Sequence, residues 1–342
     1  MVFHLYIPYR LEVIFINRIS NMFEWENYFT EWDGSYEYKD KNVVKLPDNL
    51  PMPPTTNMSA MFRSCKQLQD ISALANWDTS NVTNMREMFY NCKQLQDLTA
   101  LSNWDVSKVE YMYFMFNECK QLRDISALSN WDVSNVKNMH GMFWNCEELK
   151  NISALAKWNI SNMTYICYMF YNCQQLKDIS ALANWDTSKV KDMCYMFYDC
   201  DELEDISALS NWDTSNVTSM SGMFSGCFRL EDVSALSEWN TSKVTDMRAM
   251  FDGCTRLKDF SALVNWDISS IMCINGLSDG MLIALSSMQS YIQKTSSTAD
   301  KARIKELESR LSELEEKLET FMKIPQKSEK LYTPTLQENE QE

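Results

Sequence analysis

The chain has 342 residues, of which 32 are Lys or Arg and 47 are Asp or Glu, so its formal net charge is −15. This acidic balance excludes nucleic acid and anionic membrane as main partners, because both require a basic face. With only seven Gly and seven Pro, the chain is neither collagen-like nor of low complexity. The chain has only two His, which nearly excludes catalysis or metal binding that needs paired imidazoles. It has unusually many Met, Trp and Cys, with 23, 11 and 11 residues.

Residues 1–57 are predicted to form an N-terminal cap. They are rich in aromatic residues and end in a proline-rich run, and a solenoid needs its terminal coil covered. The apolar start, MVFHLYIPYRLEVIFI, lacks the basic region and cleavage site of a signal peptide. No stretch of 18 apolar residues is present, so no membrane insertion is expected, and no lipidation motif is seen.

Residues 58–273 contain eight repeats of 27 residues. The period is kept without slippage by a Met-Phe pair, by eight Trp from Trp77 to Trp266, and by eight Cys. The cysteines are Cys65, Cys92, Cys119, Cys146, Cys173, Cys200, Cys227 and Cys254. A period of this length predicts a solenoid, in which each coil stacks only on its neighbours.

The pattern within one unit predicts two short elements. The apolar steps of Met85–Cys92 favour a helical turn, with Asn84 as N-cap and Glu87 completing a capping box. The stretch Leu68–Leu74 favours a short strand of a parallel ladder. The predicted fold class is therefore an α/β repeat solenoid, a stack of short parallel strands and helical turns.

The cysteine column has three interpretations: core packing, a disulfide ladder or a metal site. Core packing is favoured, because equivalent Cβ vectors in stacked coils run parallel and no C-x-x-C motif is present. No metal site and no cofactor are predicted. The extra residues Cys167 and Cys194 share one offset in adjacent coils, and they are the pair expected to oxidise in an oxidising compartment.

Two columns of Asp also follow the repeat. One runs from Asp70 to Asp259 and is broken by Asn151, and the other follows each Trp and is broken by Asn159 and Asn240. Asx turns are favoured, because Asn keeps the same side-chain acceptor. Ca²⁺ binding and a glycan-hydrolysing carboxylate pair are the alternatives. No catalytic residue is predicted.

Binding residues are expected where the units differ, and the middle coils gather aromatic side chains. Exposed Tyr and Trp give large contact area at a low cost in entropy. The alternative is that these rings only cover neighbouring coils. The ligand-binding candidates are Tyr90, Tyr113, Phe114, Trp144, Tyr168, Tyr171, Tyr195 and Tyr198.

After the repeats, residues 274–297 are predicted to form a C-terminal cap helix, residues 298–323 a coiled-coil helix and residues 324–342 a disordered tail. Heptad positions a and d predict a homo-oligomer, against the alternative of a monomeric helix folded back on the solenoid. The residues at these positions are Ile304, Leu307, Leu311, Leu314, Leu318 and Phe321.

The strings NWDTSNVTNMREMFYNC (76–92) and NWDTSNVTSMSGMFSGC (211–227) resemble the BspA-like leucine-rich repeat surface proteins, in the branch known from mycoplasmas. That family repeats W-D-x-S-x-V-x-x-M-x-x-M-F-x-x-C-x-x-L; the I-S-A-L-x-x-W segment here is longer than usual. The resemblance implies a leucine-rich-repeat-like solenoid that binds a protein ligand of a host or neighbouring cell, without catalysis. It suggests an adhesin that is secreted or at the cell surface. A cytoplasmic scaffold using the same face is the alternative, and a glycan-acting enzyme is a weaker one.

Overall fold

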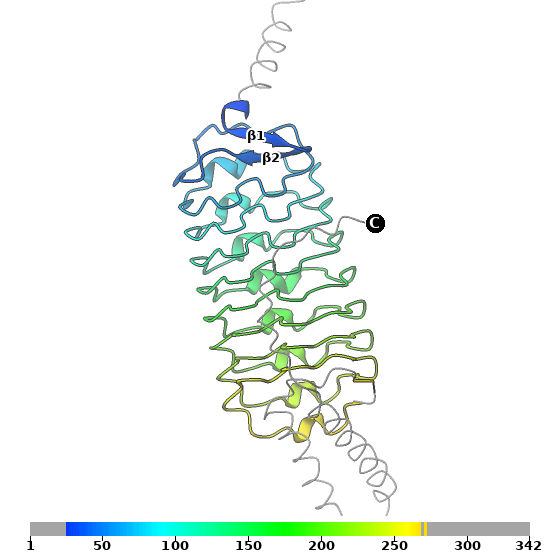
Figure 1. The fold of residues 1–342 in the computed structure, drawn as a ribbon. Coiled ribbons are helices and arrows are strands. Elements are labelled where there is room, and N and C mark those ends of the chain that lie inside the picture. The colour runs from blue at the N-terminus through cyan, green and yellow to red at the C-terminus, as the bar shows by residue number, and fades with distance from the viewer. Residues whose placement is uncertain (1–24, 268–269, 272–342) are drawn as a thin grey trace, which may run out of the picture. The chain divides into compact units, whose positions relative to one another are not determined.

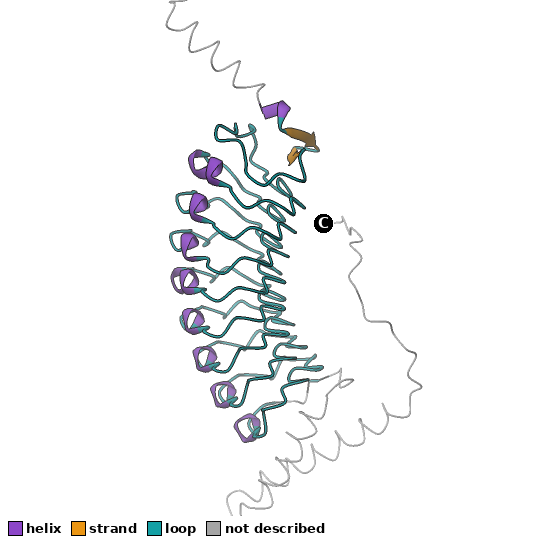
Figure 2. Cartoon of the chain, turned by 90° about the vertical axis from the view of Figure 1, so that its left-hand side faces the viewer, coloured by secondary structure: helices purple, strands orange, loops and turns teal. Residues whose placement is uncertain are grey.

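A computed structural model describes residues 25–267 and 270–271, which form a stack of coils (Figure 1). Each repeat contributes one 3₁₀ helix, and these helices line one side of the stack while turn segments line the opposite side (Figure 2). The 3₁₀ helices are η2 (Ser72–Asn76), η3 (Thr99–Leu101), η4 (Ser126–Leu128), η5 (Ser153–Lys157), η6 (Ser180–Leu182), η7 (Ser207–Leu209), η8 (Ser234–Leu236) and η9 (Ser261–Leu263). The predicted repeat solenoid of leucine-rich-repeat type is confirmed.

The predicted strand over Leu68–Leu74 does not form; a single parallel bridge, Lys45↔Asp70, occurs there, and the segment ends in η2. The carboxylate of Asp70 accepts the Ser72 backbone N–H at 2.8 Å, which turns the chain. The Leu74 N–H then donates within its own coil, to the Ile71 carbonyl at 2.9 Å, and so is not available to a neighbouring coil.

The predicted helical turn over Met85–Cys92 is also wrong, because this segment carries the ladder between coils. Alternate N–H groups donate to the next coil, for example Met85 to Tyr111 O at 2.9 Å and Phe89 to Met115 O at 2.9 Å. Isolated parallel bridges follow the same side, from Asn57↔Asn84 to Ser219↔Asp246. Most of the parallel pairing therefore lies on the side for which a helical turn was predicted.

Asn84 and Glu87 do not form the predicted capping box. Asn84 accepts the Arg86 N–H at 3.0 Å in an Asx turn, and the Glu87 N–H donates to the next coil at 3.0 Å. Glu87 has φ 54° and its buried carboxylate pairs with Arg63. A residue in the left-handed region ends any helix, so the α/β description does not hold for the described residues: their helices are all 3₁₀, and their only strands of more than one residue are β1 and β2.

The core is built from columns of identical side chains. The phenyl rings from Phe62 to Phe251 stack at 5.5–5.9 Å between centroids. Each repeat Trp donates its indole N–H to a leucine carbonyl of the preceding coil, as Trp185 does to Leu155 at 3.0 Å. From Cys92 on, each repeat cysteine is buried and its Sγ contacts a phenylalanine carbonyl of the preceding coil, as Cys200 does at 3.2 Å from Phe170 O. Core packing of the repeat cysteines is thus confirmed.

The chain before the repeats covers the first coil. The 3₁₀ helix η1 (Trp25–Asn27) leads into a hairpin of β1 (Phe29–Trp32) and β2 (Ser35–Tyr38), which pair antiparallel (Figure 1). The Phe29 ring lies 6.1 Å from the Phe62 ring, edge to face. The Tyr38 N–H donates to Met61 O at 2.7 Å.

The predicted C-terminal cap helix, coiled coil, oligomerisation residues and tail lie outside the described residues. Within the described part of the chain, no helix has the length and apolar character needed to cross a membrane.

Candidate functional site

Aromatic side chains of the middle coils form a continuous ladder on the turn side of the stack. Trp144 stacks on Tyr168 at 4.8 Å, and Tyr168 on Tyr195 at 5.0 Å. A second row stacks Tyr171 on Tyr198 at 4.5 Å. We call this set the aromatic ladder; it consists of Tyr113, Phe114, Trp144, Tyr168, Tyr171, Tyr195 and Tyr198.

The backbone of the ladder is unusual, because Phe114, Tyr168 and Tyr195 adopt φ of 56°, 59° and 54°. In the same column Gly141 and Gly222 also have positive φ. A Cβ at Gly141 would lie 2.5 Å from the Phe114 ring, and one at Gly222 would lie 2.3 Å from the Tyr195 ring. The Phe114 and Tyr195 rings therefore lie directly over the backbone of the next coil, where glycine leaves room for them.

The ladder residues are neither fully exposed nor fully buried. Each keeps part of its surface open to solvent while packing on its neighbours. Burial raises the pKa of Tyr168 and of Tyr171, so both rings lie in partly desolvated surroundings. The rings cover neighbouring coils and also present a joint aromatic surface, so the two sequence interpretations are compatible.

Tyr90 lies apart from the ladder rows. The Arg63 guanidinium covers its ring at 4.9 Å from the centroid. A similar cation caps the start of the ladder, since Arg86 lies 5.4 Å above the Tyr113 ring and donates to its hydroxyl at 2.8 Å. Of the eight candidates, the structure thus brings seven together and leaves Tyr90 outside.

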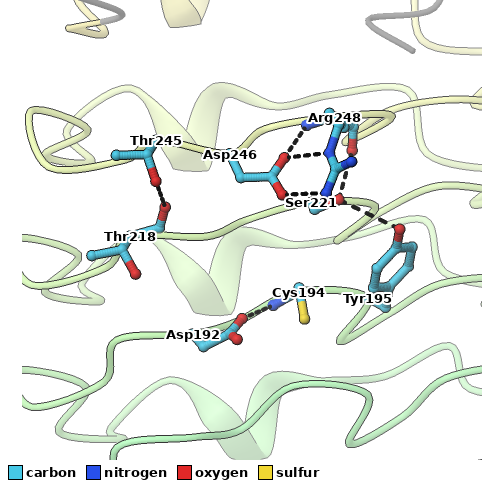
Figure 3. A network of polar contacts seen from close by, with 8 residues as sticks. All are labelled: Asp192, Cys194, Tyr195, Thr218, Ser221, Thr245, Asp246 and Arg248. Atoms are coloured by element: carbon cyan, nitrogen blue, oxygen red, sulfur yellow. Dashed lines mark hydrogen bonds and ion pairs between the residues drawn. The ribbon is translucent and has the colours of Figure 1, made fainter. Parts of the chain in front are cut away.

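The other end of the ladder is polar (Figure 3). The Ser221 hydroxyl lies 3.5 Å from the Tyr195 hydroxyl and donates to Arg248 O at 3.3 Å. Arg248 in turn forms a bidentate pair with Asp246, at 3.0 and 2.8 Å. At the first end Nε of Arg86 lies 3.6 Å from a carboxylate oxygen of Glu87, so a charged pair is present at each end of the ladder.

A cluster of titratable side chains borders the ladder. Nδ1 of His140 lies 2.8 Å from Sγ of Cys167, and Sγ of Cys167, Sγ of Cys194 and a carboxylate oxygen of Asp192 lie within 4.8 Å of one another. The imidazole ring sits between Phe114 and Tyr168, at 4.9 and 5.0 Å. We call these four residues, His140, Cys167, Asp192 and Cys194, the thiol cluster.

The thiol cluster has an asymmetric charge distribution. Hydrogen bonds from Cys194 and then from His140 lower the pKa of the Cys167 thiol to about 6, against the opposing effect of burial. The same interaction with Cys167, together with burial, raises the pKa of Cys194.

Sequence reasoning identified Cys167 and Cys194 as a pair but missed His140 and Asp192. The signal for His140 was present, since His140, Cys167 and Cys194 are spaced by the 27-residue period. Asp192 lies in a different column, and its side-chain direction is set by the Asx turn in which its carboxylate accepts the Cys194 N–H at 2.9 Å (Figure 3).

The two Asp columns form Asx turns, as favoured from the sequence. Asp178 accepts the Ser180 N–H at 2.8 Å, and hydrogen bonds from Ser180 lower the pKa of its carboxyl group. Asn151, Asn159 and Asn240 accept the equivalent N–H groups at 3.0, 3.1 and 3.1 Å. The substitution of Asn in three units thus preserves the turn.

Solved structures that resemble this chain share little of its sequence, as two of them show. The first is a leucine-rich cell surface protein from Faecalibacterium prausnitzii, with 14% sequence identity and a TM-score of 0.25. The match covers 68% of this chain and 79% of that protein's chain. The second is the functional domain of InlJ from Listeria monocytogenes, which includes a cysteine ladder; it has 12% sequence identity and a TM-score of 0.18. The match covers 72% of this chain and 67% of that chain.

Among curated proteins none matches the sequence. One family model matches residues 56–182 and again residues 168–294, which together make up more than half of the chain. The chain therefore belongs to the family described as Mycoplasma protein of unknown function, DUF285.

Proposed function

We propose that this protein is a non-enzymatic recognition module that binds a protein ligand through the aromatic ladder. The observation that carries the proposal is the ladder itself: stacked, partly exposed Tyr and Trp rings confined to consecutive coils. Rigid aromatic surfaces of this kind dominate the binding energy of protein interfaces. The charged pairs at both ends would orient a ligand whose centre is apolar.

Adhesion at a microbial cell surface is the form of recognition that we favour, in line with the family resemblance. Self-association through the heptad residues 304–321 would raise avidity without new contacts. An intracellular scaffold is the alternative, and the unpaired thiols of Cys167 and Cys194 favour it. Cell fractionation separates the two: protein found only in the cytosol, with its thiols reduced, would exclude the adhesin.

Catalysis is not part of this proposal. The Asp carboxylates that a glycan-acting enzyme would use each hold an Asx turn through one oxygen, as Asp178 does with the Ser180 N–H. Their uniform repetition along the stack gives no local pair with distinct environments, which acid–base catalysis requires.

The test compares the full-length protein with the variant Trp144→Ala/Tyr171→Ala/Tyr198→Ala, using surface proteins extracted from cultured epithelial cells. Trp32→Ala is the matched control, because Trp32 is an exposed aromatic residue outside the ladder. We expect retained proteins to be shared by wild type and control and to bind the triple variant at least tenfold more weakly. Equal retention by all three would discard the ladder as the binding surface.

Because the ladder rings also pack on one another, each variant is checked for folding by tryptophan fluorescence. A second variant, Tyr171→Phe/Tyr198→Phe, keeps both stacked rings and removes only the hydroxyl groups. It should remain folded, and it separates the contribution of hydrogen bonds from that of the aromatic surface.

A further inference from the structure

Three side chains that can ligate a metal stack in one column of consecutive coils. His140, Cys167 and Cys194 directly follow the leading apolar residue of their units, 27 residues apart. In other coils the same column holds Arg86, Tyr113, Ser221 and Arg248, so the donors are confined to one place on the stack. Because these donors occur in three coils only, the repeat pattern itself does not account for them.

The cysteines of this column differ from the core cysteines. A core sulfur such as that of Cys200 is fully buried against the Phe170 carbonyl, at 3.2 Å. Cys167 and Cys194 instead have their sulfur atoms beside an imidazole and a carboxylate. Cys194 is partly exposed, so the cluster is open to solvent on one side.

The spacing of the donor atoms suits a small divalent ion. A tetrahedral zinc ion, with Zn–S about 2.3 Å and Zn–O about 2.1 Å, places neighbouring ligand atoms about 3.6–3.8 Å apart. The two sulfur atoms and the Asp192 oxygen lie within 4.8 Å of one another, so small side-chain rotations close the site. The Asx turn with the Cys194 N–H, at 2.9 Å, already orients the Asp192 carboxylate and leaves one of its oxygens for the metal (Figure 3).

We propose that Cys167, Cys194 and Asp192 bind one zinc ion. Two thiolates and a carboxylate are a zinc ligand set, and the thiol protons pass to solvent on binding. Nδ1 of His140 lies 2.8 Å from the Cys167 sulfur, and the Nδ1–H tautomer would hold that ligand in place from the outer shell. Water occupies the fourth position, on the exposed side. The ion cross-links two adjacent coils beside the aromatic ladder, and the proposal does not depend on what the ladder binds.

The test uses the full-length protein, reduced with a phosphine, stripped with a chelator and desalted. Zn²⁺ uptake is measured by competition with a chromophoric chelator, and Co²⁺ serves as the spectroscopic probe. We expect one equivalent of Zn²⁺ per chain and a thiolate-to-cobalt charge-transfer band. Cys167→Ser and Cys194→Ser should each weaken Zn²⁺ binding at least tenfold and reduce the band. Asp192→Asn keeps the turn acceptor and should also weaken binding.

Ser221→Ala is the matched control, because Ser221 occupies the equivalent position to Cys194 in the next coil. The Zn²⁺ affinity of this variant should equal that of wild type. Thermal unfolding of each variant without metal shows that it is folded, and added Zn²⁺ should raise the melting temperature of wild type but not of Cys194→Ser. Three outcomes would overturn the proposal: no uptake at micromolar Zn²⁺, an unchanged cobalt band in the double variant Cys167→Ser/Cys194→Ser, or a Cys167–Cys194 disulfide whose reduction gives no metal binding.

Discussion

The column of stacked phenyl rings gives a sharp test of how this solenoid is stabilised. Phe170 lies between Phe143 and Phe197, with centroids 5.9 and 5.7 Å away and ring planes within 9° of parallel. Each aromatic pair contributes about 0.5–1.5 kcal/mol beyond the area that it buries. Substitution by Leu keeps most of the apolar volume, so a double-mutant cycle of Phe143→Leu and Phe170→Leu should give a coupling free energy of that size.

Phe143 and Phe224 are three coils apart, and neither ring stacks on a ring that the other contacts. Distant sites without shared contacts add to within about 0.3–0.5 kcal/mol, so the cycle Phe143→Leu with Phe224→Leu should show no larger coupling. The assay is equilibrium urea unfolding followed by tryptophan fluorescence. Because long repeat arrays can lose two-state behaviour, the slopes of the variants must agree with wild type. Equal coupling in the two cycles would refute stabilisation by nearest-neighbour stacking.

Three further predictions concern the repeated polar contacts. Trp185→Phe removes the indole donor to Leu155 O, which keeps its bond from the Trp158 N–H at 3.1 Å, so it should lower the free energy of unfolding by about 0.5–1.5 kcal/mol in urea titrations. The lowered pKa of Asp178 means that its Asx turn contributes stability above the unfolded pKa of about 3.9, which is lost as pH falls through the folded value. Asp178→Asn should therefore match wild type at neutral pH and show a weaker pH dependence of the melting temperature below pH of about 4, whereas equal acid sensitivity would contradict the assignment. Burial raises the pKa of Cys200, so mass spectrometry after iodoacetamide treatment should find it unmodified in the native protein and alkylated only in urea.

The repeat period predicted which residues stack, because a constant spacing of 27 leaves one register for the coils. It placed Phe170 and Cys200 in the core and brought His140 into line with Cys167. It could not say which side of the coil carries the inter-coil hydrogen bonds. Apolar steps of three, one and three suit a helical turn, but a chain of tight turns buries the same residues.

The signal that separates these two conformations lies along the columns rather than within one unit. The residue before each repeat cysteine has positive φ at every coil. This column contains Asn91, Asn145, Asn172, Gly226 and Gly253, the residue types that tolerate the left-handed region. A left-handed Asn or Gly is also common just after a helix, so this column alone fits both conformations. The Glu87 column, in the middle of the segment, excludes the helix because its residues also have positive φ, and Gly141 and Gly222 are its signal in the sequence.

The aromatic ladder is costly in backbone terms, and this cost bears on its role. A side chain with a Cβ in the left-handed conformation costs roughly 1–2 kcal/mol relative to the right-handed one. Phe114, Tyr168 and Tyr195 adopt it at a column where Gly141 and Gly222 show that glycine fits. Stacking contributes only about 0.5–1.5 kcal/mol per pair, so the rings add little net stability over glycine. Ala60, Glu87 and Ala249 adopt the same conformation in this column without stacking, so the cost belongs to the turn of every coil and stacking of the rings offsets part of it in the middle coils.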